Sequence, residues 1–343
     1  MKRVRIESDQ VTAFPELVEA AHRAARGKRD RLDVQAFFDQ LERSLSHVQQ
    51  ALLDARLPNG SYRRFSIRDP KPRIIHAAPF ADRVAHHALM YPMDAPLDQW
   101  QPATSFACRR GKGVHAAIVH AQRQCRRYPW FVKMDVSGYF EHIDHSVLIQ
   151  LLHRRLKGPW LFRLLEAVLA SHCSVPGRGL PIGALTSQHF ANTYLVPADQ
   201  WLISHPLCRA HCRYMDDTVV WAESREAANV LWHDYQDWLE QTLHLSLKPV
   251  VVQRTGHGLT LCGIRIRPYA LRPSRRRQQL FRRHLRCWEK AYQEADIDMF
   301  TLQRRVDSLV SMLSPGQSLE WRRNLMAQRI IAGPLVESEA GAL

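Results

Sequence analysis

Two adjacent aspartates, Asp216 and Asp217, stand between two short strand-like segments, and they constrain the fold of this chain more than any other feature. The flanking segments 210–213 and 218–222 have the composition of two strands, which predicts a hairpin with the acids at its turn. Adjacent carboxylates at a hairpin tip repel each other, a cost that is tolerated where a divalent cation bridges them. For an isolated pair we would favour an ordinary solvent-exposed turn, so the neighbouring segments decide.

A second acidic motif lies upstream. Residues 130–136 form a short, mostly apolar run that contains Asp135 and predicts a buried strand. Enzymes that transfer phosphoryl groups often use two divalent metal ions roughly 3.5–4 Å apart. Because Mg²⁺ prefers oxygen ligands and keeps some of its waters, a few carboxylates and the substrate phosphates suffice to hold it. Asp135 and Asp216 on neighbouring strands would supply such ligands, with Asp217 in support.

A loop followed by a helix is predicted between the two acidic motifs. Residues 179–183 are rich in Gly and Pro, whereas the run from Ala184 to Leu195 has a helical pattern. A glycine such as Gly183 lets backbone approach a flat substrate closely. A loop that merely connects two helices would have a similar sequence, so this segment gains meaning only beside the acidic motifs.

In this order the motifs resemble those of prokaryotic reverse transcriptases, over roughly residues 60 to 266. The resemblance implies an RNA-directed DNA polymerase that uses two Mg²⁺ ions, with Mn²⁺ as a substitute, an RNA template, a DNA or RNA primer and dNTPs. Residues 245–249 are similar to a family motif whose lysine, here Lys248, is thought to protonate the leaving pyrophosphate. An ordinary surface lysine is the alternative. The implied catalytic residues are Asp135, Asp216, Asp217 and Lys248, and the implied metal ligands are Asp135, Val136, Asp216 and Asp217.

The resemblance also implies which residues bind the nucleotide. Residues 62–75 are similar to the fingers hairpin whose cations embrace the incoming triphosphate, and Arg grips phosphate oxygens with its planar fork. Arg73 is the first candidate, Lys71 the second and Arg64 a further one, while a solvated basic hairpin is the alternative. Phe140 stands where the family carries an aromatic residue that blocks the 2′-hydroxyl of a ribonucleotide. Core packing is its alternative role.

Among reverse transcriptases, the chain most resembles those of diversity-generating retroelements, in the group II intron-like lineage. The resemblance lies in segments 73–89 and 107–115 and in the substrate-binding positions Ile182, Gly183 and Gln188. Most reverse transcriptases carry Gln in place of Ile182 and Pro in place of Gln188. An aliphatic side chain cannot make the polar contact of Gln near the new base pair, and in this family the site is associated with misincorporation opposite template adenines. Ala184 departs from the pattern, since members often carry Asn there.

Three alternatives stay open or are weakened by the sequence. A standalone antiphage-defence or retron-like reverse transcriptase shares many core motifs, although the Val-Thr-Gly-Leu stretch of retron enzymes is replaced by residues 253–258. Too few residues follow Ile266 for both the maturase extension and the nuclease domain of a group II intron enzyme. From another class, a non-catalytic RNA-binding ribonucleoprotein component is weakened by the intact acids.

Basic residues exceed acidic ones by 48 to 33, a formal charge of +15, which indicates a polyanionic partner and salt-sensitive binding. The excess concentrates in 272–286, where apolar residues at helical spacing predict an amphipathic helix with a cationic face. On a polymerase thumb this face would follow the template–primer backbone. A solvated helix is the alternative, although so many arginines without acids repel one another. The expected nucleic-acid-binding residues are Arg275, Arg276, Arg277, Arg282 and Arg283.

The fold class implied is α+β, a right-hand polymerase with fingers, a palm built on a split βαβ antiparallel sheet, and a helical thumb. Helical patterns occupy about 37–52, 80–95, 146–172, 184–203 and 227–238, and strands are expected within 250–266. The expected domains are N-terminal helices and fingers (1–125), palm (126–268), thumb (269–332) and a flexible tail (333–343).

No apolar signal segment and no run long enough to span a membrane is present, and the cysteine count is odd at seven, so we expect a cytoplasmic protein. The resemblance implies that it is bacterial or phage-encoded. Cys208 and Cys212 near His205 and His211 fit no standard zinc pattern, and local packing is the favoured role. Diversity-generating enzymes typically work with a small basic accessory protein, which is the one protein partner that the resemblance implies.

Overall fold

A four-stranded antiparallel sheet, in the order β6-β7-β4-β8, carries the acidic motifs. It is formed by β4 (Trp130–Asp135), β6 (Ala210–Tyr214), β7 (Asp217–Ala222) and β8 (Val251–Arg254). Successive residues of β4 and β7 point to opposite faces, and both faces are covered by helices. Val132 and Val220 pack in the cluster of helix α12 (Arg225–Leu243), and Phe131 and Trp221 pack in that of α6 (Val114–Arg127). This double burial explains why the strand sequences are almost continuously apolar.

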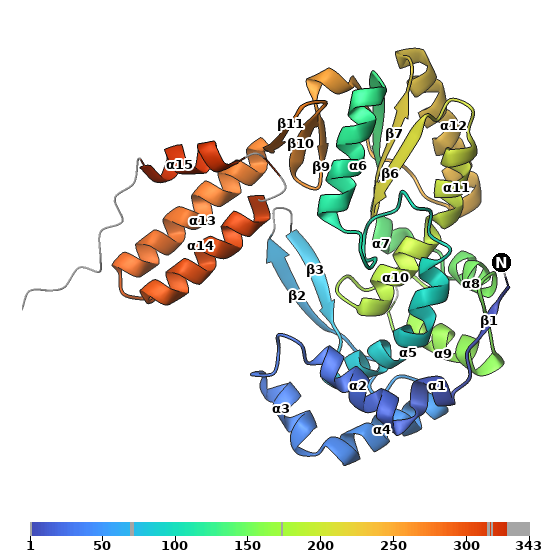
Figure 1. Ribbon diagram of the computed structural model, residues 1–343. Helices are drawn as coiled ribbons and strands as arrows, with labels where there is room; N and C mark the ends of the chain where they lie inside the picture. The colour runs from blue at the N-terminus through green and yellow to red at the C-terminus, as the bar shows by residue number, and fades with distance from the viewer. Residues whose placement is uncertain (1, 69–71, 173, 314–315, 317, 328–343) are drawn as a thin grey trace, which may run out of the picture.

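The computed structural model describes residues 2–68, 72–172, 174–313, 316 and 318–327, and it mixes helices with several small sheets (Figure 1). The predicted tail at 333–343 lies outside this range. Within it, no helix is long and apolar enough to cross a membrane.

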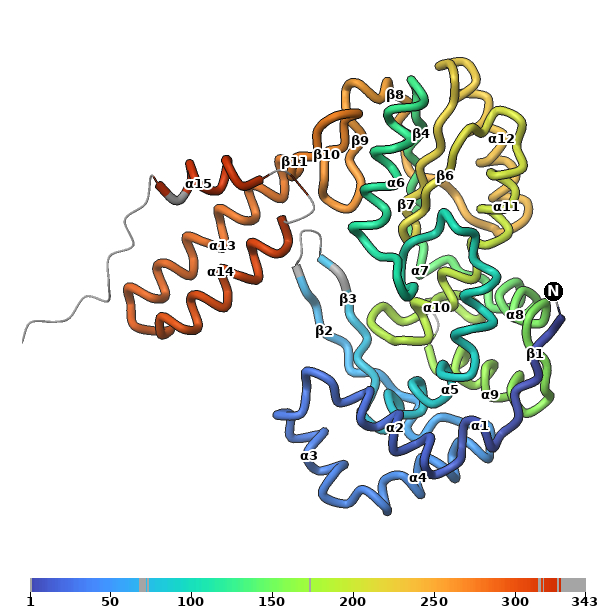
Figure 2. Tube along the Cα trace, viewed as in Figure 1, coloured from blue at the N-terminus to red at the C-terminus, as the bar shows by residue number. Residues whose placement is uncertain are grey.

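Helices of the N-terminal region lie at the base of a hairpin. They are α1 (Asp9–Thr12), α2 (Phe14–Ala24), α3 (Leu32–Asp39), α4 (Leu41–Leu53) and α5 (Phe80–Asp98). The single helix expected over 37–52 is wrong: the chain leaves helical geometry at Gln40, where φ is −122° and ψ is 45°. The predicted hairpin is present as β2 (Arg63–Arg68) and β3 (Pro72–Ala77), and Figure 2 shows it projecting from these helices.

Two longer helices expected from sequence are also divided. Residues 146–172 form α8 (His145–His153) and α9 (Pro159–Ala170), separated by β5 (Leu156–Lys157), which pairs in parallel with β1 (Val4–Arg5). Gly158 makes this approach feasible, because a Cβ there would lie 2.8 Å from the carbonyl oxygen of Ile6. Residues 184–203 form α10 (Leu185–Tyr194) and α11 (Val196–Ser204), with Pro197 in the first turn of the second helix.

The C-terminal region begins with a 3₁₀ turn (Thr255–His257) and a three-stranded sheet of β9 (Leu259–Leu261), β10 (Ile264–Arg267) and β11 (Ala270–Pro273). Helices α13 (Arg275–Gln293), α14 (Met299–Leu313) and α15 (Leu319–Ala327) follow and extend to one side of the molecule (Figure 1). They have a small core of their own, formed by Phe281, Leu285, Leu309 and Leu313. We call these three helices the C-terminal arm.

Candidate active site

The carboxylates of the two acidic motifs meet at one end of the central sheet. Asp135, the last residue of β4, is the register partner of Asp217, the first residue of β7. Tyr214 also pairs with Asp217, so Met215 and Asp216 form a two-residue turn. The predicted strands and hairpin are therefore present, with Asp216 in the turn and Asp217 already within a strand. Met215 adopts a left-handed conformation with φ of 56°, which is uncommon for a residue other than glycine.

Two lysines pair with these acids. The Lys248 Nζ lies 2.5 Å from Oδ1 of Asp135, and the Lys248 backbone N–H donates to the Asp135 carbonyl at 2.8 Å. The Lys133 Nζ lies 2.8 Å from Oδ1 of Asp217. Sequence reasoning singled out Lys248 but missed Lys133. The signal was available, because alternate residues of a strand share a face and Lys133 precedes Asp135 by two positions.

Burial and mutual repulsion make this cluster costly to ionise. Burial raises the pKa of Asp216 above its ordinary value, and the neighbouring Asp135 and Asp217 carboxylates raise it further. Burial likewise raises the pKa of Asp217, while the positive charge of Lys133 opposes the rise. A divalent cation between the carboxylates would remove this cost, so their donor set suits Mg²⁺.

The number of protein ligands limits what the site can bind. In the described ranges, no group of three or more His, Cys, Asp or Glu side chains is arranged to hold a metal ion. Mg²⁺ is usually held by one or two carboxylates together with water and substrate phosphates, which fits this arrangement. Nor do Cys208 and Cys212 join such a group, in keeping with local packing; Cys212 is fully buried.

A cavity of about 920 Å³ opens beside Asp216 and Lys248. Phe140 lines it from α7 (Tyr139–His142), half-buried, and Ile182 lines it from the loop before α10. Residues of β2 and β3 and the segment before them close another side, namely Tyr62, Arg64, Pro72, Ile74 and His76. The structure thus brings together Phe140, Ile182, Asp216 and Lys248.

Other predicted substrate residues lie elsewhere. Gly183 and Gln188 line a second cavity, of about 1130 Å³, together with the basic residues Lys28, Arg31, Arg63 and Arg83. Strand alternation explains the division, because Arg63 and Arg64 of β2 point to opposite faces of the hairpin.

The loop between the two cavities is held against β3. The N–H of His76 donates to the Ile182 carbonyl at 3.0 Å. Gly183, with φ of 114°, sits so close that a Cβ would lie 3.1 Å from Cγ2 of Ile75. The glycine therefore serves close approach of backbone to a protein strand.

The two basic residues that the sequence favours most for binding the triphosphate belong to the β2–β3 hairpin, and their side chains are not described. Lys71 and the side chain of Arg73 lie outside the part of the chain that the structure describes. Arg64, a further candidate from sequence, lines the cavity that contains Asp216 and Lys248.

Four of the five arginines expected to bind nucleic acid are exposed on α13, and none of them forms an ion pair within the described residues. They are Arg275, Arg276, Arg282 and Arg283. Arg277 differs: its Nη1 donates to the Met312 carbonyl at 2.7 Å, and its guanidinium packs over Gly263. Arg277 therefore ties α13 to α14 and to the β9–β10 turn instead of joining the free cationic face.

The model of the reverse transcriptase (RNA-dependent DNA polymerase) family matches residues 60–252, which is more than half of the chain and includes Asp135, Asp216, Asp217 and Lys248. This chain therefore belongs to the reverse transcriptase (RNA-dependent DNA polymerase) family. The predicted resemblance to a bacterial-type reverse transcriptase is confirmed.

Similarity to individual proteins supports this assignment. The chain is 24% identical over 171 residues to the group II intron-encoded protein LtrA of Lactococcus lactis subsp. cremoris, which covers 47% of this chain and 28% of LtrA. It is 25% identical over 173 residues to protein YkfC of Escherichia coli K12, covering 45% of each. It is 29% identical over 90 residues to nuclear intron maturase 1, mitochondrial, of Arabidopsis thaliana, covering 26% of this chain and 13% of that protein. The chain spans less than half the length of each.

Proposed function

We propose that this protein extends a primer on an RNA template by two-metal phosphoryl transfer. The observation that carries the proposal is the meeting of Asp135, Asp216 and Asp217 at one end of the central sheet, where Asp216 lines a cavity together with Phe140 and Lys248. Carboxylates on a rigid sheet beside a nucleotide-sized cavity are what positioning and charge neutralisation of a transferring phosphoryl group require.

Each acidic residue has a role in this proposal. Asp135 and Asp216 hold the metal ions and Asp217 supports them from the start of β7. The Val136 side chain is a hydrocarbon without a ligand atom, so its contribution to a metal would come from its backbone carbonyl. Two bound Mg²⁺ ions would lower the pKa of the primer hydroxyl and neutralise the leaving oxygens. Lys248, held against Asp135, is placed to give a proton to the pyrophosphate.

The two cavities divide the substrates between them. In the cavity beside Asp216, Phe140 excludes the 2′-hydroxyl and Arg64 faces the triphosphate, with Arg73 and Lys71 as further candidates. The second cavity, lined by Gln188, Gly183 and basic residues, would take the template strand. Template RNA is a polyanion, and this cavity carries several basic side chains.

In this scheme the chain has the domains of a right-hand polymerase. Residues 1–125 form N-terminal helices and fingers, 126–268 the palm, and 269–332 a thumb whose exposed arginines follow the template–primer backbone. Residues 333–343 form the tail.

We further propose the diversity-generating role, with error-prone synthesis opposite template adenines and a small basic accessory protein. Its support is Ile182, an aliphatic side chain in the same cavity as Asp216, where a polar contact to the new base pair would otherwise be made. A standalone antiphage-defence or retron-like enzyme is the alternative within the family. A ribonucleoprotein component without polymerase activity is the alternative outside it.

The test is primer extension with Mg²⁺ on a defined RNA template, followed by sequencing of the cDNA. Extension that stops without Mg²⁺, with errors concentrated opposite adenines, is the expected result. Evenly spread errors would reject the diversity-generating role and favour a defence or retron-like enzyme. RNA binding without any extension would reject the polymerase and favour the ribonucleoprotein component.

A further inference from the structure

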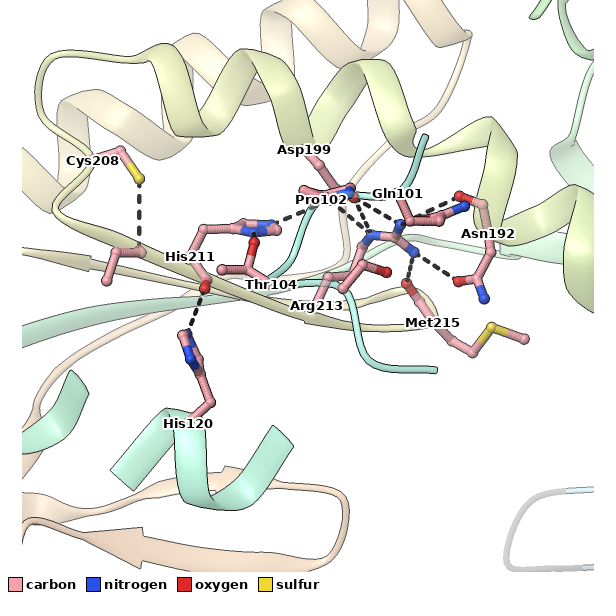
Figure 3. A network of polar contacts seen from close by, with 12 residues as sticks. Gln101, Pro102, Thr104, His120, Asn192, Asp199, Cys208, His211, Arg213 and Met215 are labelled. Carbon is pink, nitrogen blue, oxygen red and sulfur yellow. Dashed lines mark hydrogen bonds and ion pairs between the residues drawn. The ribbon is translucent and has the colours of Figure 1, made fainter. Parts of the chain in front are cut away.

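The guanidinium of Arg213 is fully buried beneath the Tyr-Met-Asp-Asp hairpin, with 1% of its side chain exposed (Figure 3). Its Nε donates to Asp199 Oδ1 at 2.7 Å, and its Nη2 donates to Asp199 Oδ2 at 2.7 Å. Nη1 donates to Asn192 Oδ1 and Nη2 to Gln101 Oε1, both at 3.0 Å. The remaining donor of Nη1 reaches the Met215 carbonyl at 3.0 Å.

This last contact joins the buried network to the turn that presents Asp216. Met215 immediately precedes Asp216 and has a positive φ without being glycine. Such a conformation is strained and persists only where the surroundings determine it. The bond from Arg213 to the Met215 carbonyl is one such determinant, and it acts on the peptide unit that connects Met215 with Asp216.

The network is anchored to several separate segments. Asp199 lies on α11 and Asn192 on α10, while Gln101 belongs to the loop after α5. The Arg213 backbone N–H donates to the Thr104 carbonyl at 2.9 Å, and its carbonyl accepts from the Phe106 N–H at 3.0 Å. The position of the turn is thereby fixed by contacts to helices α10 and α11 as well as by its own strands.

His211 lies against Asp199 from the other side. Its Nε2 lies 3.2 Å from Asp199 Oδ1, and its Nδ1 lies 2.8 Å from the Thr104 hydroxyl. Both side chains of the ion pair are 1% exposed, so neither can exchange partners with water. A buried pair of this kind is weak evidence for stability, because apolar residues of similar volume often serve as well. Its geometry therefore calls for another explanation.

We infer, on the basis of the proposed function, that Arg213 is a positioning residue whose contact with the Met215 carbonyl sets where the Asp216 carboxylate meets the metal ions. Arg213 touches neither substrate nor metal. It acts through the turn, and only a planar fork with five donors reaches Asp199, Asn192, Gln101 and Met215 together. A lysine keeps the charge opposite Asp199 but cannot make these bonds at once.

The test compares two variants with a matched control. Arg213→Lys keeps the buried charge, and the double variant Asp199→Asn/Arg213→Gln removes both charges, so that neither leaves an unpaired buried ion. Arg109→Lys is the control, because Arg109 also binds a carboxylate, Asp98, at 2.5 Å and the nearby Pro102 carbonyl at 2.7 Å without touching the turn.

Two measurements are made on each protein: hydrogen exchange of peptides covering 210–222, and the Mg²⁺ concentration that gives half-maximal extension. Both Arg213 variants are expected to exchange faster in the hairpin than elsewhere in the sheet. We also expect them to need several-fold more Mg²⁺ and to lose about 100-fold in rate, the scale of a misplacement near 1 Å. Arg109→Lys is expected to match the wild type in both.

Two outcomes overturn the inference. One is a folded Arg213 variant with unchanged hairpin exchange and an unchanged Mg²⁺ midpoint. The other is faster exchange over the whole sheet with the midpoint preserved, which would make Arg213 merely structural. If the wild type does not extend a primer, the proposed function fails, whereas hydrogen exchange, which needs no catalysis, still decides whether Arg213 holds the turn.

Discussion

Charged residues beneath the β6–β7 hairpin and those along α13 differ in where their partners lie. Under the hairpin, Arg213 is buried and all its donors are used within the protein. Along α13, arginines such as Arg276 and Arg283 are exposed and form no ion pair within the described residues. Strand β7 of the hairpin contributes buried residues to two core clusters, whereas the C-terminal arm has a small core of its own.

This difference indicates separate roles for the two regions: one sets the geometry of the active site and the other sets the affinity for nucleic acid. Buried, mutually satisfied charges fix the position of a few atoms, which is what a chemical step needs. Exposed, unpaired cations contribute charge that a polyanion can neutralise in many registers. We therefore expect substitutions in the hairpin region to change rate, selectivity or metal dependence, and substitutions on α13 to change affinity and its dependence on salt.

The largest effect is expected for Asp216→Asn. Loss of one metal-binding charge should lower primer extension by at least about 1,000-fold, the upper end of what a single electrostatic stabiliser contributes. RNA binding, measured by fluorescence anisotropy, should stay near the wild-type value. If the variant still extended primers, Asp216 would not be a metal ligand, and the hairpin region would not control the rate as the comparison with α13 requires.

The same variant has a second expected property. The folded state raises the pKa of Asp216, so ionisation of this group destabilises the fold as pH rises through the raised pKa. Without Mg²⁺, Asp216→Asn should therefore melt at a higher temperature than the wild type at neutral pH, and this gain should vanish in acid, where the aspartate is protonated. Melting curves at both pH values check the sign.

Next in size is the replacement of four exposed arginines on α13 by glutamine. Affinity for a template–primer duplex should fall about 100-fold at moderate salt, and the slope of log affinity against log salt should lose about 0.7 to 0.9 per phosphate contact. The rate at saturating duplex should remain. The residues changed are Arg275, Arg276, Arg282 and Arg283.

A control with the same change in net charge is available among exposed arginines elsewhere. If it weakens binding equally, α13 has no special role and the contrast with the hairpin region fails. The control residues are Arg3, Arg29, Arg163 and Arg225, all exposed.

A change of selectivity is expected for Phe140→Ala. Removing the ring opens the cavity beside Asp216, so discrimination between dNTP and rNTP should fall by at least about tenfold, the scale on which a pocket separates similar substrates. Competitive incorporation of the two nucleotide types measures it, and duplex affinity should not change. Unaltered discrimination would assign Phe140 to core packing.

The smallest effect is expected for Lys133→Met. Lys133 opposes the rise in the pKa of Asp217, so its loss should raise that pKa further. As pH falls, Asp217 then becomes protonated earlier, and the acid limb of the rate profile should move to higher pH, with a several-fold loss near neutrality. Lys133→Arg should keep the wild-type profile. A profile that both variants share with the wild type would exclude a role for this ion pair.

Local features of the sequence predicted the acidic motifs well. Strands β4 and β7 are mostly apolar, and the paired acids stand between two short strand-forming segments, so strand and turn follow from neighbouring residues. The helix α13 followed in the same way from the spacing of Leu285 and Trp288. The family match is consistent with these motifs and spans all four catalytic candidates, Asp135, Asp216, Asp217 and Lys248.

Features that depend on distant residues were missed. The break at 154–158 exists because β5 pairs with β1, about 150 residues earlier in the chain. The partners of Arg213 come from α10, α11 and the loop after α5, and no local pattern brings them together. Gly183 and Ile182 are adjacent in sequence yet line different cavities, which only the docking of their loop on β3 determines.

The ion pairs of Lys133 and Lys248 have a consequence for the order of substrate binding. In the resting enzyme these lysines act as substitute counter-ions for Asp217 and Asp135. A divalent ion that arrives alone must compete with these lysines for the carboxylates. A triphosphate that arrives alone is repelled by the negative charge of the carboxylates. A metal–nucleotide complex brings both signs of charge at once and offers each side chain a new partner. On the proposed function, the site would therefore bind a metal–nucleotide complex more readily than either component alone.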